Sequence, residues 1–271
     1  MPFAESTGAR IFYEVIDRPA PWRIDPETIV FNHGIGIDHR MWTKWIPALA
    51  DAYRLVLMDM RGFGASTIPA ADAHWSMELL VNDVFAVARA AGIEGFHFTG
   101  ESMGGTIGLF AYLRDARAIR TVTISNGAHV GATIKHLDDW RDAIRRGGMR
   151  GWSEMMTERR FYDDALSRAE RAWFTDAQAA CSAESCLNAL EVLRAVDLTA
   201  KLSEITAPVL ILHGDSSPFI PASVTADLHA RLPDSELQIF HHAKHGLPLS
   251  HGAECGRALR SFLDRRTRTL K

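Results

Sequence analysis

At 271 residues the chain can bury a sizeable core, and its formal net charge of −3 argues against nucleic acid or an anionic membrane surface as a partner. Three cysteines without metal-ligand spacing argue against a disulfide framework or a zinc site. No apolar run reaches the roughly 18 residues that a membrane span requires, and the N-terminus lacks the regions of a signal peptide. We expect a cytoplasmic protein with a small-molecule partner, and the sequence leaves a homodimer open.

Short apolar runs bounded by Gly, Pro and Asp alternate along the chain with longer segments of helical period. This alternation predicts an α/β fold with a mostly parallel central sheet flanked by helices. In chain order, the expected strands are Arg10–Val15, Thr28–Asn32, Arg54–Asp59, Phe96–Gly100, Thr121–Ser125, Val209–His213 and Glu236–Phe240. The expected helices are Met41–Ala52, Ser76–Ala91, Met103–Ala116, Ala222–Leu232 and His251–Arg265.

The first central strand runs into the sequence His33-Gly34-Ile35-Gly36. Glycines let a backbone approach a ligand closely, so Gly34 and Gly36 are expected beside the substrate, with the N–H of Ile35 free to bind a substrate oxygen. His33 is interpreted as a structural residue that bonds the loop backbone. Arg40 lies just beyond, and we expect it either at the border of the pocket or on the surface where a helix begins.

The strand Phe96–Gly100 leads through Ser102, Met103 and Gly104 into a helix. A nucleophile displayed on a sharp strand-to-helix turn takes a strained conformation, and small residues two positions before and after it make room for that turn. Gly100 and Gly104 meet this demand, so we interpret Ser102 as a nucleophile. At a helix start, free N–H groups and the helix dipole favour negative charge, and the Met103 N–H is expected to be an oxyanion donor.

No convincing strand occurs from Gly127 to about Lys201, where helical stretches are rich in Trp, Met, Arg and Ala. We interpret residues 127–201 as a helical cap inserted into a core made of residues 1–126 and 202–271. A basic cluster in the cap could hold a carboxylate-bearing substrate, but a solvated helix face is the preferred interpretation. The cluster consists of Arg145, Arg146, Arg150, Arg159 and Arg160.

Five landmarks occur in order: HGIG, the stretch DMRGFGAST from Asp59 to Thr67, GESMGG, a strand that ends LILHGD, and HHAKHG. Together they resemble the α/β-hydrolase fold superfamily, and the match covers nearly the whole chain outside the cap. Within that superfamily the chain is most similar to the 3-oxoadipate enol-lactonase and meta-cleavage C–C hydrolase branches. The resemblance implies the α/β-hydrolase fold, a nucleophilic serine at Ser102, and a scaffold role for Asp59 and Arg61.

A serine hydroxyl is a weak nucleophile unless a base accepts its proton, and histidine is the usual base. Four histidines follow the last expected strand, Glu236–Phe240: His241, His242, His245 and His251. The resemblance places the catalytic base a short loop after this strand, which selects His245. Neighbouring strand residues point to opposite faces, so His241 and His242 are interpreted as polar residues of the strand end.

The resemblance also implies an aspartate after LILHGD, and an ungapped count places Ser217 at that position. In the preferred interpretation Asp215 is the catalytic acid, although it lies about 6 to 7 Å from the expected position and needs a remodelled loop. In the second, the acid comes from elsewhere, and Asp138, Asp139 or Glu101 would need unusual placement; for Glu101 a structural contact beside the turn is the preferred interpretation. In the third, Ser217 holds His245 itself, directly or through water, as a serine–histidine dyad. Ser217 is in any case expected at the substrate.

These residues predict a hydrolase in which Ser102 attacks a carbonyl carbon of a small molecule and His245 transfers the proton. Because the catalytic aspartate is missing from its expected position, we expect an activated substrate such as an enol ester, a lactone, a thioester or a vinylogous 1,5-diketone. A serine nucleophile argues against epoxide hydrolase or haloalkane dehalogenase chemistry, because both need a carboxylate. No metal or organic cofactor is implied. The alternatives are a non-catalytic small-molecule binder, a lyase or a cofactor-free oxygenase on the same scaffold.

Overall fold

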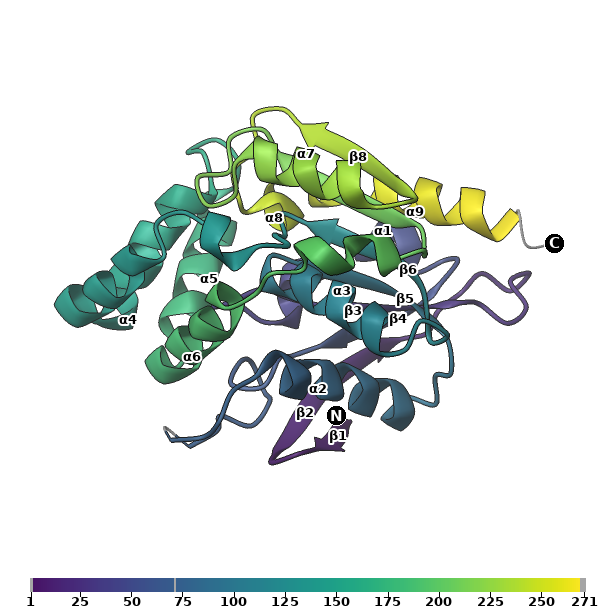
Figure 1. The fold of residues 1–271 in the computed structure, drawn as a ribbon, viewed down its shortest axis with the longest axis horizontal. Coiled ribbons are helices and arrows are strands. Elements are labelled where there is room, and N and C mark those ends of the chain that lie inside the picture. The colour runs from purple at the N-terminus through teal and green to yellow at the C-terminus, as the bar shows by residue number, and fades with distance from the viewer. Residues whose placement is uncertain (1, 71, 269–271) are drawn as a thin grey trace.

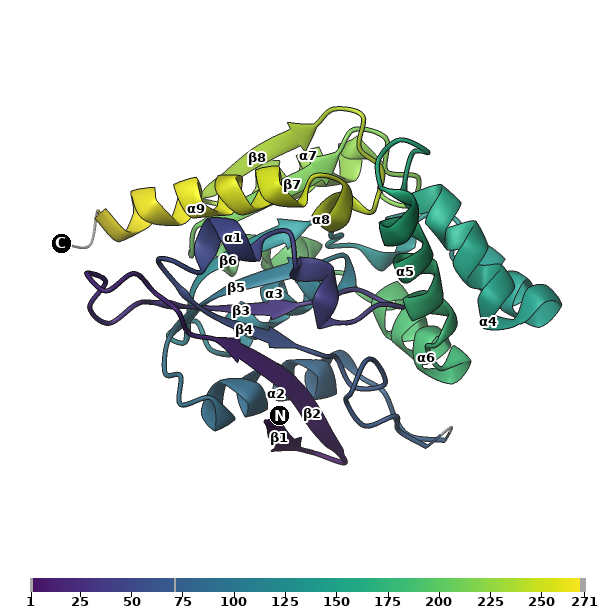
Figure 2. The same ribbon diagram turned by 180° about the vertical axis from the view of Figure 1, so that it is seen from behind.

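The structure is a computed structural model that describes residues 2–70 and 72–268. Eight strands form one sheet in the order β1-β2-β4-β3-β5-β6-β7-β8, with helices on both faces (Figure 1 and Figure 2). The strands are β1 Phe3–Ser6, β2 Ala9–Ile16, β3 Thr28–Asn32, β4 Arg54–Met58, β5 Phe96–Glu101, β6 Ile119–Ser125, β7 Val209–Gly214 and β8 Ser235–Phe240. The helices are η1 His39–Trp42, α1 Ile46–Leu49, α2 Met77–Ala90, α3 Met103–Arg114, η2 Gly131–Thr133, α4 Asp138–Arg160, α5 Arg168–Ala179, α6 Ala183–Arg194, η3 Thr199–Glu204, α7 Ala222–Arg231, α8 Leu247–Ser250 and α9 Gly252–Arg268.

The sheet is mostly parallel, which confirms the expected fold class. Strands β3 to β8 pair in parallel, while β2 runs antiparallel to both β1 and β4. All residues of β3, β5 and β7 are buried, because helices cover both faces of these strands. Alternate residues of β3 enter different cores: Val30 packs on the side of α2 and α3, and Ile29 and Phe31 pack on the side of α1 and α9.

The expected strands and helices of the core are confirmed to within three residues at their ends, with the exception of one helix. Strand β1 was not predicted, since four residues at the edge of a sheet carry little periodic signal. The helix expected over Met41–Ala52 is wrong, because the segment forms the separate short helices η1 and α1. Pro47 lies in the first turn of α1 and has no N–H with which to continue a preceding helix.

The chain between β6 and β7 forms the helices α4, α5 and α6, which lie together at one end of the sheet, on the left in Figure 1. A bridge between Val130 and Asp197 closes the base of this insertion. The same end of the sheet holds the turn after β5 and the loops after β7 and β8, so the inserted helices cover those loops. Among the described helices, none is long and apolar enough to cross a membrane.

Candidate active site

Ser102 occupies the sharp turn between β5 and α3, with backbone angles φ 51° and ψ −116°. A positive φ is strained for a residue with a side chain, and hydrogen bonds on both sides hold this one. Ser102 N donates to Ser125 O at 2.8 Å, and Ser102 O accepts from Gly105 N at 3.0 Å. The turn therefore presents the Ser102 hydroxyl at the N-terminus of α3, where the helix dipole favours negative charge.

Three glycines allow the backbone to close around this turn. A Cβ at Gly100 would collide with the backbone of Gly104, and a Cβ at Gly104 would collide with the carbonyl of Asn32. A Cβ at Gly34 would collide with the Glu101 carboxylate and come within 3.1 Å of Ser102 Cβ. The loop after β3 thus lies directly on the nucleophile turn, as close approach by glycine allows.

His245 lies in the loop between β8 and α8, with its Nε2 atom 3.2 Å from Ser102 Oγ. The backbone on both sides of His245 is fixed by other elements. Asn126 Nδ2 donates to His245 O at 2.9 Å, and the following Gly246 N donates to the carbonyl of Arg160 at 2.9 Å. Asn126, which directly follows β6, was not among the site residues predicted from the sequence.

Ser217 lies on the other side of the imidazole, with its Oγ 3.0 Å from His245 Nδ1. The N–H of Ile220 also donates to Ser217 Oγ, at 3.4 Å. In the tautomer with a proton on Nδ1, this proton is donated to Ser217 and the free Nε2 accepts the Ser102 hydroxyl proton. A hydroxyl can also donate, so Ser217 selects this tautomer less strictly than a carboxylate does.

The structure does not bring Asp215 to His245, which departs from the preferred sequence interpretation. Asp215 Oδ2 accepts from His241 Nδ1 at 2.9 Å and from His242 N at 3.1 Å, while Oδ1 accepts from Ala243 N at 3.2 Å. These contacts tie the turn after β8 to the end of β7. The reason is register: Asp215 directly follows β7 and faces the neighbouring strand end, whereas Ser217 is two residues further along the loop.

The imidazole of His245 is fully enclosed. Burial, and next the positive charge of Arg160, hold the pKa of His245 well below its ordinary value, so the ring is neutral at pH 7. The Phe219 ring packs against it edge to face, with 5.0 Å between ring centres. A neutral imidazole next to a hydroxyl is the form that can accept the serine proton.

A small cavity of about 20 Å³ adjoins Ser102 and His245, enough room for about one water molecule. Apolar side chains from the inserted helices and the neighbouring loops line most of it: Ile134, Leu137, Trp140, Leu190, Leu193 and Ile220. Ile35 lines it as well, and among the described residues the N–H groups of Ile35 and Met103 donate no hydrogen bond. Two free donors next to a nucleophile can bind an oxyanion.

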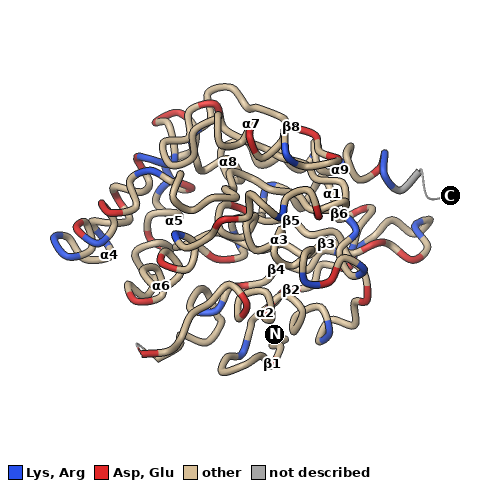
Figure 3. Tube along the Cα trace, viewed as in Figure 1, with Lys and Arg blue, Asp and Glu red and all other residues tan. Residues whose placement is uncertain are grey.

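Arg160 is not part of a solvated helix face, so the sequence interpretation of this residue was wrong. It is 2% exposed and lines the cavity of Ser102, while Arg145, Arg146 and Arg150 are exposed as expected. Acidic and basic residues alternate along the outer part of α4 (Figure 3). The helical spacing of Arg160 is the signal that could have indicated its burial. It continues the buried stripe of α4 that is formed by Trp152, Ser153, Met156 and Thr157.

Arg160 connects the inserted helices to the catalytic loops. Its Nη2 atom donates to the carbonyl of Ile35 at 3.4 Å, and its Nη1 atom lies 3.7 Å from Glu101 Oε1. The guanidinium packs over the Phe174 ring of α5. Through these contacts the position of α4 is linked to the loop that carries Ile35.

Glu101, the last residue of β5, is fully buried between Arg160 and the imidazole. Its Oε1 atom lies 3.6 Å from His245 Nε2. Burial raises the pKa of Glu101 to about 7, against the opposing effect of the Arg160 charge. This carboxyl group therefore changes its charge close to neutral pH.

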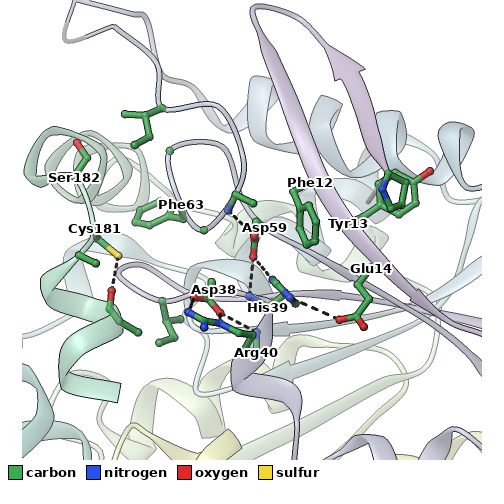
Figure 4. A pocket seen from close by; sticks show the side chains of 18 of the residues that line it. Phe12, Tyr13, Glu14, Asp38, His39, Arg40, Asp59, Phe63, Cys181 and Ser182 are labelled. Carbon is green, nitrogen blue, oxygen red and sulfur yellow. Dashed lines mark hydrogen bonds and ion pairs between the residues drawn. The ribbon is translucent and has the colours of Figure 1, made fainter. Parts of the chain in front are cut away.

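A larger cavity, of about 680 Å³, lies between α5 and the loops after β3 and β4 (Figure 4). Arg40 is found here rather than at Ser102. Its Nε and Nη2 atoms donate to the Asp38 carboxylate at 2.9 and 2.7 Å, and its guanidinium lies 5.5 Å from the centre of the Trp173 ring. The structure therefore does not bring Arg40 to the nucleophile.

Asp38, His39 and Asp59 come close enough in this cavity to share a metal ion. Their polar atoms, however, bond to one another and to the backbone. Asp59 Oδ1 accepts from both the backbone N and Nδ1 of His39, at 2.8 and 2.7 Å, and Asp59 Oδ2 accepts from Ala65 N at 2.8 Å. The cluster thus ties two loops together, in line with the expected scaffold role of Asp59.

His33 bonds the loop backbone in the way that the sequence interpretation expects. Its Nδ1 atom donates to Gly34 O at 2.7 Å, and its Nε2 atom accepts from Met60 N at 2.9 Å. Both ring nitrogens are occupied, so the side chain fixes the shape of the glycine loop. His33 takes no part in proton transfer in this arrangement.

Known proteins share both the sequence pattern and the fold. A family model of the alpha/beta hydrolase fold matches residues 27–251. The chain is 30% identical to 3-oxoadipate enol-lactonase 1 of Acinetobacter baylyi, over 70% of this chain and 71% of that protein. It is 28% identical to the pimeloyl-[acyl-carrier protein] methyl ester esterase of Photobacterium profundum, over 87% and 94%.

The crystal structure of an enol-lactonase from Burkholderia xenovorans superposes with a TM-score of 0.86. The superposition covers 97% of this chain and 100% of that chain, at 23% sequence identity. At this identity the likeness concerns the fold alone.

Proposed function

This chain belongs to the alpha/beta hydrolase fold family, and from that membership we propose that it is a serine hydrolase that cleaves an ester or lactone bond of a small molecule. The observation that carries the proposal is a line of three contacting side chains, Ser102, His245 and Ser217, with 3.2 Å and 3.0 Å between the bonded atoms. The named relatives are an enol-lactonase and a methyl ester esterase, which supports the same reaction class.

The reaction follows from these contacts. Ser102 Oγ attacks the carbonyl carbon as its proton passes to His245 Nε2, and the N–H groups of Ile35 and Met103 bind the developing oxyanion. The imidazolium then gives the proton to the leaving oxygen, and an acyl group remains on Ser102. Attack by water, activated by the same imidazole, releases the acid and restores the serine.

A substrate with a good leaving group suits this site. Ser217 is neutral and orients His245 without supplying charge, so a leaving group that departs with little proton-transfer help reacts best. The apolar lining favours a carbon-rich acyl or alcohol part. Because the cavity beside Ser102 holds only about 20 Å³, the inserted helices must move to admit such a substrate.

A substrate panel tests the proposal. With matched acyl groups, we expect kcat/KM to be at least about 10-fold higher for aryl and enol esters and for enol lactones than for alkyl esters, because leaving-group basicity decides the rate when the acid is weak. Steady-state kinetics at pH 8, with aryl carbamates and vinylogous diketones included, provides the measurement. A wild-type protein that binds these compounds tightly but turns none of them over would be a receptor on a hydrolase scaffold.

A second experiment distinguishes Ser217 from Asp215 as the residue that orients His245. Ser217→Ala removes the hydrogen-bond partner of His245 Nδ1 and is expected to lower kcat by about 10-fold, as loss of one neutral hydrogen bond implies. Asp215→Asn should change kcat by less than about 3-fold and lower the melting temperature instead, because Asp215 holds the turn after β8. The opposite ranking would return the acid role to Asp215.

A further inference from the structure

A catalytic acid has two tasks in a serine hydrolase: it orients the imidazole, and it stabilises the imidazolium by its charge. In this chain Ser217 can perform the first task through its contact with Nδ1, but a hydroxyl carries no charge. The second task needs an anion near the ring. Glu101 is placed for it, with its Oε1 atom 3.6 Å from His245 Nε2.

The surroundings of Glu101 keep it directed at this histidine. Both of its oxygens are buried, and a backbone hydrogen bond from Gly34, together with the Arg160 charge, opposes the effect of burial on the pKa of this carboxyl. Gly34 lies directly on the carboxylate, so the loop after β3 closes one side. The charged or titratable groups that face Glu101 are His245, from the loop after β8, and Arg160, from α4. A buried carboxyl group with so few hydrogen bonds is costly to keep ionised, and the Arg160 charge offsets part of that cost.

We propose that Glu101 is a positioning residue that acts through His245: its carboxylate stabilises the imidazolium while Ser217 orients the ring. The acidic role is thus divided between two residues on opposite sides of the imidazole. This inference rests on the proposed function, since it concerns the same proton transfer from Ser102.

Glu101 stays ionised in every step of the proposed proton transfer. The Ser102 proton moves to His245 Nε2 as the bond from Oγ to the carbonyl carbon forms, and it then moves to the leaving oxygen. A separation of 3.6 Å is too long for a hydrogen bond, so Glu101 acts by charge and takes no proton from the ring. In a dry site such a charge interaction is stronger than in water.

Arg160 keeps Glu101 in its charged form. The guanidinium lies 3.7 Å from Glu101 Oε1 and lowers the pKa of that carboxyl, which burial alone would raise further. Arg160 belongs to α4, and its own carbonyl accepts the Gly246 N–H next to His245. The inserted helices therefore place the Arg160 charge beside Glu101, where it favours the ionised form of that carboxyl group.

The pH dependence of the rate tests this proposal. Because the pKa of Glu101 is about 7 and that of His245 lies well below its ordinary value, kcat/KM of the wild type is expected to rise with pH through a midpoint near 7. In Glu101→Gln the carboxylate is absent at every pH. We expect the rate to be about 10- to 100-fold lower at pH 8 and to approach the wild-type rate near pH 5.5, where Glu101 is protonated in the wild type as well.

A purely structural role would lower the rate by the same factor at every pH, and that outcome would overturn the proposal. Arg160→Met is the second variant, in case Glu101→Gln does not fold. Loss of the cation raises the pKa values of both Glu101 and His245, so the midpoint should move to higher pH, and an unmoved midpoint would also contradict the proposal. Covalent labelling of Ser102 by a fluorophosphonate is followed in parallel: if the wild type is not labelled, the proposed hydrolase function fails, whereas a labelled wild type with an unchanged pH profile in both variants refutes the role of Glu101 alone.

Discussion

Replacement of Ser102 by alanine is expected to lower kcat for an aryl ester by at least about 10⁴-fold, with residual turnover from the oxyanion donors and binding. In the proposed mechanism this hydroxyl attacks the substrate, and among the described residues no second hydroxyl or thiol is hydrogen-bonded to His245 Nε2. His245 Nε2 would lose the partner that lies 3.2 Å away. Alanine is small enough for the backbone angle of φ 51°, so the turn itself should survive.

Circular dichroism and the melting temperature of the variant serve as the control, because the loss of kcat can be assigned to the hydroxyl only if Ser102→Ala folds like the wild type. The glycines on both sides of the turn remain, so we expect a stability close to that of the wild type. A folded Ser102→Ala protein that keeps more than about a tenth of the wild-type kcat would mean that another group attacks the substrate.

Replacement of His245 by alanine is expected to lower kcat by about 10³- to 10⁵-fold, since no other base in the described part of the chain contacts the Ser102 hydroxyl. The imidazole is buried, so its removal leaves a cavity next to Ser102. Added imidazole should enter that cavity and restore part of the rate, because it supplies the missing proton acceptor in place. The measurement is kcat against imidazole concentration at fixed pH.

His241→Gln provides the matched control for this variant. His241 lies four residues earlier in the same segment, but its side chain is 97% exposed and contacts Asp215 rather than Ser102. We expect its kcat to stay within about 2-fold of the wild type, in the range of a surface substitution. Equal losses in the two variants would indicate a disturbed loop and would contradict the assignment of His245 as the base.

Most of the fold could be predicted from residue patterns, because buried parallel strands are continuous apolar runs bounded by turn residues. Strand β3 is the clearest case: Thr28–Asn32 was predicted with its observed bounds. The short helices η1 and α1 were harder, since their apolar spacing resembles one longer helix. Only Pro47 signalled the break, and a proline is compatible with the first turn of a helix.

Ser102 could be proposed as the nucleophile from local requirements, such as the glycines around it, and His245 could be proposed as the base from the resemblance to the α/β-hydrolase superfamily. The partner of His245 could not, since it depends on how a loop leaves β7. A step of two residues separates Asp215, which binds the end of β8, from Ser217, which contacts the imidazole. Glu101 of β5 and Arg160 of α4 are distant in the sequence and meet only in the folded chain, which no local pattern encodes.

The site of modification by a fluorophosphonate probe is the most direct test of the central claim, that His245 activates the hydroxyl of Ser102. Intact-protein and peptide mass spectrometry of the wild type should show one adduct, located on Ser102, which is absent from Ser102→Ala and forms more slowly in His245→Ala. An unmodified wild type, or an adduct on another residue while Ser102 stays free, would contradict the account.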